Sequence, residues 1–251
     1  MKITNHPVVV LSGIKIRCNL QFQDTAGYLR TIIRDECDAG AAVCEEAAVS
    51  EQQFADWENA GNRKDAYGEF CLLCMPISEV LLKHGRCLFH AAAVSYKGRA
   101  WLIAAGSGTG KSTQCRNLTT MYPDEFIVIN GDKPVIKTCD DGSVIVHPSP
   151  WNGKEGWHGA AAAPLAGIVL LRRGTENSLV RVSEEKAAWR VFLSVFQSYT
   201  DDQAIRMAAA IAEKIIKSSP IWIMTSHTVP DSTKLLYECI LKESMSYGLQ
   251  D

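Results

Sequence analysis

The sequence has no long hydrophobic run and no strong excess of charge of one sign. No apolar stretch approaches the roughly 20 residues that a helix needs to cross a bilayer, so we expect no membrane partner. The formal net charge is −2, whereas a protein that binds a nucleic-acid backbone usually carries a strongly basic face. We therefore expect no nucleic-acid partner. The short apolar run at 8–11 is not followed by a small-residue cleavage site, which predicts a cytoplasmic chain.

A second CxxC pair and histidines at zinc-ligand spacing are also missing near the single CxxC of Cys71 and Cys74. Without them, two buried thiols on a helix are a better interpretation than a zinc site. The nine cysteines are odd in number and scattered through apolar segments. This usage favours reduced thiols in the cytosol over a disulfide framework.

What is present is typical of a globular chain. Hydrophobic residues make up 47% of the 251 residues and charged residues 22%, which is ordinary for a soluble domain. This length allows one large domain or one domain with a small appendage. We predict an α/β fold with a small α+β extension at 1–66 and a core domain at 67–251.

The most informative stretch is a glycine-rich loop between an apolar run and a helix-like segment. Residues 105–112 read AGSGTGKS. The three alternating glycines can adopt positive φ and direct backbone N–H groups at phosphate oxygens. A helix that begins near Ser112 adds its own free N–H groups and its positive end. Lys111 would reach the β- and γ-phosphates of a nucleotide, and the Ser112 hydroxyl would bind Mg²⁺.

We therefore predict a P-loop that binds ATP, or another nucleoside triphosphate, with Mg²⁺. Ala105 stands where this motif usually has its first glycine, and a methyl group is a small steric change. A glycine-rich turn without a ligand is the alternative, and it leaves the lysine unexplained. The predicted nucleotide-binding residues are Gly106, Ser107, Gly108, Thr109, Gly110, Lys111, Ser112 and Thr113.

Hydrophobic periodicity and turn signals predict the order of the other elements. Residues 38–66 show no clear period. Elsewhere we expect a hairpin at 8–20, a short helix after Asp24, a helix at 69–83, strands at 88–94, 100–104, 126–130, 134–138, 143–147 and 165–171, a helix from 183, a helix at 202–217, a strand at 221–224 and a helix at 231–243. The continuous apolar run at 126–130 is typical of a strand covered on both faces.

Two side chains flank the loop symmetrically in the sequence. His90 and Asp132 each lie 21 positions from Lys111, on the strands before and after the loop and its helix. A carboxylate at the end of a strand beside a phosphate loop is suited to hold magnesium, so Ser112 and Asp132 are the predicted metal ligands. His90 is either functional or a hydrogen-bonded core residue.

Two further segments supply candidate contacts. The loop at 147–159 is rich in tryptophan, histidine and glycine and has no helix or strand period. Its large side chains are candidates for substrate contacts, and aromatic packing over the sheet edge is the alternative. The arginines at 172–173 would clamp a transferring phosphate or form a solvated turn. The predicted substrate contacts are Trp151, Lys154, Trp157 and His158.

Residues 67–225 resemble the HPr kinase/phosphorylase family and, more distantly, the phosphoenolpyruvate carboxykinase fold. The resemblance lies in His90 within FHAA, the loop SGTGKS at 107–112 and the turn NGD at 130–132. A PWNGK element at 150–154 is similar to one in HPr-kinase-related proteins of peptide-modification gene clusters.

This resemblance implies a mixed-sheet nucleotide-binding core. It also implies transfer of the γ-phosphoryl group of ATP to a serine of a peptide or protein, with His90, Lys111 and Asp132 as catalytic residues. By analogy, it suggests a homo-oligomer.

The acidic turn departs from that family. The family has two adjacent aspartates there, one for the metal and one for the acceptor hydroxyl. Here only Asp132 is present, because Gly131 precedes it and Lys133 follows it. A nucleotide-binding regulatory or scaffold protein without phosphoryl transfer is therefore the second hypothesis. A small-molecule kinase is the third.

Overall fold

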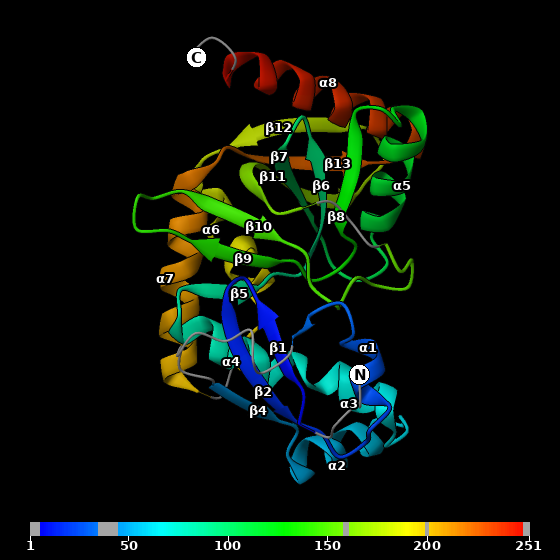
Figure 1. The fold of residues 1–251 in the computed structure, drawn as a ribbon. Helices are drawn as coiled ribbons and strands as arrows, with labels where there is room; N and C mark the ends of the chain where they lie inside the picture. The colour runs from blue at the N-terminus through cyan, green and yellow to red at the C-terminus, as the bar shows by residue number, and fades with distance from the viewer. Residues whose placement is uncertain (1–5, 35–44, 158–160, 199–200, 248–251) are drawn as a thin grey trace.

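A nine-stranded mixed sheet forms the centre of the molecule, and a four-stranded sheet lies on one side of it (Figure 1). The computed structural model describes residues 6–34, 45–157, 161–198 and 201–247. The strands are β1 (Val8–Leu11), β2 (Ile14–Asn19), β3 (Ile33–Arg34), β4 (Glu45–Ala48), β5 (Arg86–Leu88), β6 (Ala91–Tyr96), β7 (Arg99–Ala104), β8 (Phe126–Asn130), β9 (Val135–Thr138), β10 (Val144–His147), β11 (Ala163–Arg173), β12 (Ser178–Val182) and β13 (Ile221–Ser226). The helices are α1 (Thr25–Tyr28), α2 (Glu51–Asn59), α3 (Ala66–Leu72), α4 (Cys74–Lys83), α5 (Lys111–Met121), α6 (Glu184–Ser194), α7 (Asp202–Ser218) and α8 (Val229–Tyr247).

The large sheet combines parallel and antiparallel pairs. Its order is β5-β9-β10-β11-β7-β6-β8, and β13 pairs with β11 and β12. Strand β11 pairs in parallel with β7 and β13, while its first residues pair antiparallel with β10. The fold is therefore mixed α/β, as the sequence predicted at this coarse level.

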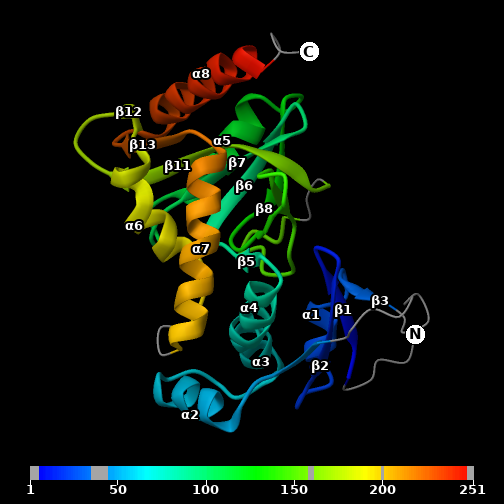
Figure 2. The same cartoon turned by 90° about the vertical axis from the view of Figure 1, so that its left-hand side faces the viewer.

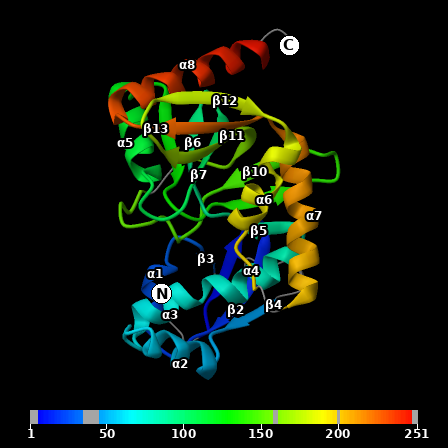
Figure 3. The ribbon, with the colours of Figure 1, turned by 180° about the vertical axis from the view of Figure 1, so that it is seen from behind.

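Helices cover both faces of this sheet (Figures 2 and 3). On one face, α6 and α7 contribute Val191, Ala208 and Ile215 to a core shared with Leu102 and Ile168. Apolar residues of α7 recur every three or four positions, so one stripe of the helix is buried. On the other face, α5 and α8 pack against β7 and β11.

The N-terminal sheet, ordered β3-β1-β2-β4, shares a core with α3 and α4. Leu73 and Ile77 pack in one cluster with Val9 and Ile16, and that cluster extends to Trp151. The hydrophobic cluster thus spans residue 66. The division into 1–66 and 67–251 remains a prediction.

Several predicted elements take a different form. Strand β8 is an edge strand that pairs only with β6 among the described residues, and Ile127 is 58% exposed. The other four residues of β8 are buried, so the predicted covering of both faces holds along most of the strand and fails at Ile127.

Two predicted continuous elements are interrupted. The predicted helix at 69–83 is two helices, since Leu73 lies between α3 and α4 and Pro76 falls in the first turn of α4, where proline is tolerated. The predicted strand at 88–94 is divided between β5 and β6 at Phe89 and His90. The helix expected after Asp24 is the single turn α1.

Candidate functional site

The glycine-rich loop joins β7, which ends at Ala104, to α5, which begins at Lys111. Gly108 and Gly110 have φ of +72° and +116°, a backbone region that side chains with a Cβ rarely adopt. A Cβ at Gly108 would meet no atom within 4 Å, so space lies beyond it. The backbone at 106–108 is exposed. The loop therefore presents an accessible, glycine-dependent backbone directly before a helix N-terminus.

Lys111 lies folded against this loop. Its residue is only 8% exposed, and its Nζ donates to the Ala105 carbonyl at 2.8 Å. The same Nζ is 3.1 Å from Nε2 of His90. Burial lowers the pKa of Lys111, against the opposing effect of the Asp132 carboxylate. A backbone carbonyl thus holds the ammonium at the loop.

Backbone hydrogen bonds bring His90 beside the turn after β8. The N–H of His90 donates to the Ser194 carbonyl at 2.7 Å, and the N–H of Ala91 donates to the Asp132 carbonyl at 3.0 Å. His90 Nε2 then lies 3.4 Å from Oδ1 of Asp132. The interruption between β5 and β6 therefore places the imidazole beside the carboxylate.

Asp132 connects this histidine to a second lysine. Its Oδ2 accepts from Lys133 Nζ at 2.5 Å. Burial acts to raise the pKa of Asp132, but the hydrogen bond from His90 and the charge of Lys133 outweigh it, so the net pKa is lowered. Three predicted site residues, Lys111, His90 and Asp132, thus form one line of successive polar contacts. Lys133 is the last residue of this line.

The proton on His90 decides which contact forms. When Nε2 carries a proton, it can donate to Asp132. When it carries none, it can accept from Lys111. One nitrogen cannot do both, so these two neighbours compete for it.

Asn130 fixes the shape of the turn that carries Asp132. It is fully buried, and its Oδ1 accepts from the backbone N–H groups of Asp132 at 2.9 Å and Lys133 at 2.8 Å. Its Nδ2 donates to the Ser149 carbonyl at 3.0 Å. The sequence analysis used Asn130 only as part of a motif. An asparagine that begins a turn after a strand is a signal for such side-chain-to-backbone bonds.

Gly131 has a steric role in the same turn. A Cβ at this position would lie 2.2 Å from the Asn152 carbonyl oxygen and 3.1 Å from Cε3 of Trp157. The loop at 147–157 therefore packs directly on the glycine. An aspartate at 131, as in the resembled family, would require the backbone at 152 to move.

The candidate substrate contacts differ in how deeply the structure buries them. Trp151 is 4% exposed, stacks on Phe70 and donates from Nε1 to the Phe70 carbonyl at 2.9 Å, which corresponds to the packing alternative. Trp157 is half-buried against Gly131. Lys154 is exposed, and His158 lies outside the described residues.

Arginines from β11 and α6 lie beside the loop. Arg173 Nη2 donates to the Gly108 carbonyl at 2.6 Å, whereas Arg172 donates from Nε to Oγ1 of Thr225 at 3.0 Å. Arg190 Nη2 donates to the Leu171 carbonyl at 3.2 Å. The sequence analysis missed Arg190, which has no motif around it.

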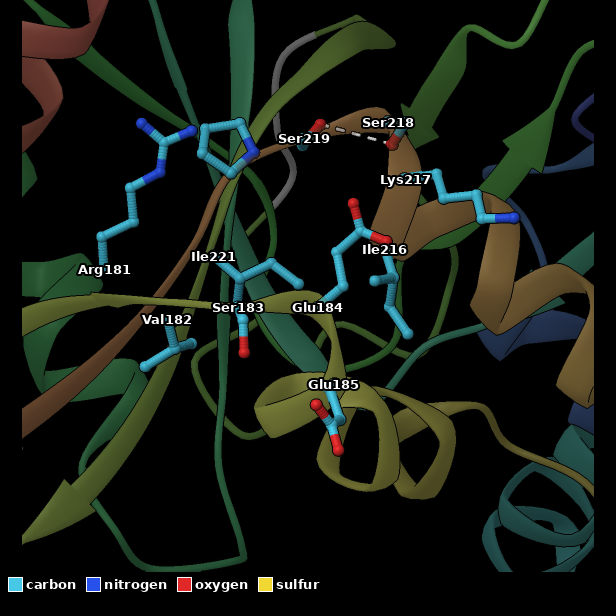
Figure 4. A pocket seen from close by; sticks show the side chains of 11 residues that line it. Arg181, Val182, Ser183, Glu184, Glu185, Ile216, Lys217, Ser218, Ser219 and Ile221 are labelled. Atoms are coloured by element: carbon cyan, nitrogen blue, oxygen red, sulfur yellow. Dashed lines mark hydrogen bonds between the residues drawn. The ribbon is translucent and has the colours of Figure 1, made fainter.

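Two hollows lie away from the loop at 105–112. A pocket of about 600 Å³ is formed by the end of β12, the start of α6 and the end of α7 (Figure 4). The neighbouring groove between α6 and α7 has about 690 Å³. Neither includes a residue of the loop at 105–112.

The described residues hold neither a metal-binding cluster nor a membrane-spanning helix. No three His, Cys, Asp or Glu side chains there gather into a metal site. Cys71 is half-buried in α3 and Cys74 is buried in α4. No described helix is long and apolar enough to span a bilayer.

The fold and site define a mixed α/β protein with a glycine-rich strand-to-helix loop beside a lysine–histidine–aspartate line. The chain belongs to the family described as SynChlorMet cassette protein ScmC, whose model matches residues 57–224. This range begins within α2 and ends within β13. No curated protein matches the chain in sequence.

Solved structures also resemble the chain. One is the HPr(Ser) kinase/phosphatase from Coxiella burnetii, with 10% sequence identity and a TM-score of 0.39. The match covers 65% of this chain and 94% of that one. This likeness is too distant to transfer an activity.

Proposed function

We propose that the chain is an ATP-dependent kinase that transfers the γ-phosphoryl group to a serine, or another hydroxyl, of a peptide or protein. The observation that carries this proposal is the line from Lys111 through His90 to Asp132 at the glycine-rich loop. In this line, a lysine that would bind phosphate lies beside an imidazole and a carboxylate that would orient an acceptor hydroxyl.

The loop residues would bind the nucleotide. The backbone N–H groups of the exposed residues Gly106, Ser107 and Gly108, together with the first turn of α5, would receive the phosphate oxygens. The predicted Thr109, Gly110 and Thr113 lie on the same path from loop to helix. Lys111 would exchange the Ala105 carbonyl for phosphate oxygens, because a phosphate is the stronger partner of an ammonium.

Once Lys111 has left the imidazole, the tautomer that carries its proton on His90 Nε2 could donate to Asp132. That bond would orient the carboxylate toward an acceptor hydroxyl. Because Asp132 keeps a lowered pKa, it would remain ionised and able to accept the hydroxyl proton in a hydrogen bond. Phosphoryl transfer depends on such positioning and charge neutralisation more than on covalent chemistry by the protein.

Mg²⁺ would have to share Asp132 with the acceptor hydroxyl, because the turn at 130–133 holds no second carboxylate. Ser112, half-buried in the first turn of α5, and the carboxylate of Asp132 would be the protein ligands of Mg²⁺. The ion would neutralise phosphate charge when bound. Lys133 already pairs with Asp132, so its ammonium would have to share the carboxylate or withdraw.

A variant at Lys111 tests the proposal. With γ-labelled ATP, Mg²⁺ and a library of serine-containing peptides, we expect Lys111→Ala to lower transfer by about 100-fold or more, because it removes a charge that stabilises the transition state. Lys214→Ala, on the exposed surface of α7, is the matched control and should transfer like the wild type. Equal labelling by wild type and Lys111→Ala would contradict the proposal.

A second candidate function is nucleotide binding without transfer, in a regulatory or scaffold role. The Asp132–Lys133 pair favours it, because it neutralises the only carboxylate of the turn. Under this alternative, Mg-ATP should raise the melting temperature without labelling any peptide. Lys133→Ala should then produce labelling, whereas Gly131→Asp is a poor test because of its close contact with the backbone at 152.

We infer that residues 1–66 form an α+β extension that helps to receive the acceptor, and that the chain works in the cytoplasm. Assembly into a homo-oligomer is a further expectation, measurable by light scattering of the purified protein.

A further inference from the structure

A pocket of about 560 Å³ lies where the segment before α1 meets the start of α3. Two tyrosines and two aspartates line it, and none of its lining residues is basic. The lining residues are Gln21, Phe22, Gln23, Asp24, Tyr28, Asp65, Ala66 and Tyr67. Its walls therefore combine aromatic rings with negative charge.

The two tyrosines are exposed but held in fixed orientations. Tyr28 is 46% exposed and Tyr67 is 55% exposed. Their rings meet edge to face with centroids 5.7 Å apart, and Tyr28 stacks on Phe70 at 5.1 Å. Partly exposed aromatic rings such as these are suitable surfaces for a cation.

The carboxylates of Asp24 and Asp65 differ in the hydrogen bonds and ion pairs that they already form. Asp24 is exposed and makes no capping hydrogen bond to α1. Asp65 caps α3 by accepting from the N–H of Gly68 at 2.8 Å, and its other oxygen is 4.0 Å from Nε of the exposed Arg63. Asp24 is thus the carboxylate more available to a ligand.

A buried carboxylate makes the pocket rigid. Glu69 is fully buried and accepts from Gln21 N at 2.6 Å, Phe22 N at 3.1 Å and Thr25 Oγ1 at 2.5 Å. Three donors compensate the cost of burying this carboxylate. They also attach the segment at 21–25 to α3, so the pocket exists before any ligand arrives.

A continuous series of contacts joins this pocket to the turn that carries Asp132. Phe70, beneath Tyr28, stacks on Trp151 with centroids 5.6 Å apart. The Trp151 carbonyl accepts from the N–H of Lys133 at 2.9 Å, and Lys133 pairs with Asp132. Figures 1 and 3 show α1 on the side of the N-terminal elements that is nearer the large sheet.

We propose that this pocket binds a cationic side chain, the guanidinium of an arginine or the ammonium of a lysine, carried by the acceptor peptide or protein. The cation lies against the rings of Tyr28 and Tyr67, and Asp24 balances its charge. Binding of the cation stands on the pocket alone, while its assignment to the acceptor rests on the proposed kinase function.

Small probes test the pocket without any catalysis. In an NMR titration of the full chain, N-acetyl-arginine amide should shift the side-chain signals of Tyr28 and Tyr67. N-acetyl-citrulline amide has nearly the same shape without the charge, and we expect it to bind at least about 5-fold more weakly. N-acetyl-lysine amide should bind like the arginine probe. Equal binding of the arginine and citrulline probes would overturn the proposal.

Surface variants locate the binding. Asp24→Asn and Tyr67→Ser should each weaken the arginine probe by about 3- to 10-fold, since each removes one attraction to the cation. Asp140→Asn, on the exposed turn between β9 and β10, is the matched control and should leave the affinity unchanged. Unchanged affinity in both pocket variants would show that the probe binds elsewhere and would refute the site.

A labelling assay tests whether the bound cation belongs to the acceptor. Serine peptides that carry arginine should be labelled faster than the same peptides with citrulline, and Asp24→Asn should remove this preference. If labelling occurs without such a preference, the assignment to the acceptor is wrong. If no peptide is labelled at all while the arginine probe still binds, the kinase proposal fails and the cation pocket remains.

Discussion

At the scale of single residues, the site depends on residues whose roles their motifs do not reveal. Lys111, His90 and Asp132 follow from the loop and from the resemblance, and the structure places His90 Nε2 3.1 Å from Lys111 Nζ and 3.4 Å from Asp132 Oδ1. Asn130, which shapes the turn, was not predicted as a positioning residue, because its role depends on backbone groups that only the folded turn brings to it. The same is true of Gly131.

Asn130 offers the sharpest prediction at this scale. Asn130→Ala removes an acceptor for two backbone N–H groups and a donor to Ser149. We expect the free energy of unfolding to fall by about 2–4 kcal/mol, because the N–H of Asp132 loses its acceptor and the Ser149 carbonyl loses its donor in a packed turn. Urea denaturation measures this. Asn19→Ala loses only an exposed bond to His6 and should stay within about 0.5 kcal/mol of the wild type.

The buried His147 is expected to make the stability of the fold depend on pH. Burial lowers the pKa of His147 to about 4, with Lys137 and Arg86 acting in the same direction. Its Nε2 is buried without a hydrogen-bond partner among the described residues. Between about pH 6.5 and pH 4 the unfolded chain therefore binds more protons at this residue than the folded chain. This residue makes stability fall as the pH is lowered through that range.

The variant His147→Leu should lose less stability than the wild type between pH 6.5 and pH 4, as measured by urea denaturation at a series of pH values. His227→Leu, on an exposed segment before α8, provides the comparison and should follow the wild-type curve. Parallel curves for wild type and His147→Leu would show that His147 is not the cause.

At the scale of elements, strong local patterns gave correct predictions and weak ones did not. The period-two alternation at 14–20 and the turn at Asp140–Gly142 predict the hairpins that the structure contains. The region at 38–66 has no clear period, yet α2 lies within it and begins with a capping box of Ser50 and Gln53, a signal that its sequence carried. Strand β12 was missed because its exposed residues follow no apolar alternation.

The contact between β7 and β11 depends on a missing side chain. A Cβ at Gly167 would lie 2.4 Å from Cζ3 of the buried Trp101. We expect Gly167→Ala to lower the free energy of unfolding by about 1–3 kcal/mol, because the indole must move in a packed core. Gly27→Ala meets no atom within 4 Å and serves as the control. A wild-type urea midpoint for Gly167→Ala would contradict this account.

At the scale of the whole molecule, the mixed α/β class was predictable from the order of strands and helices. The division of the chain at residue 66 stays a prediction, and apolar residues of α3 and α4 share a hydrophobic cluster with the N-terminal sheet. Sequence periodicity shows that Phe70, Leu73 and Ile77 are buried on one side, but it does not show which sheet covers them.

This sharing of a core predicts the behaviour of a shortened chain. A chain that begins at residue 67 would expose Leu73, Ile77 and Leu81, which pack against Val9 and Ile16. We expect such a chain to aggregate or to unfold at a lower urea concentration than the full chain. Circular dichroism during denaturation would measure the midpoint. Full retention of the midpoint would favour the predicted independent core of 67–251.

The competition of Lys111 and Asp132 for one imidazole nitrogen also affects the order in which the proposed kinase would bind its substrates. In the proposed kinase, an imidazole nitrogen that accepts from Lys111 could not at the same time donate to Asp132, so an acceptor that arrived before the nucleotide would meet an unprepared centre. Arrival of the nucleotide would draw the lysine away and complete the centre. Steady-state kinetics should therefore show a compulsory sequence of encounters, with the triphosphate first and the hydroxyl second.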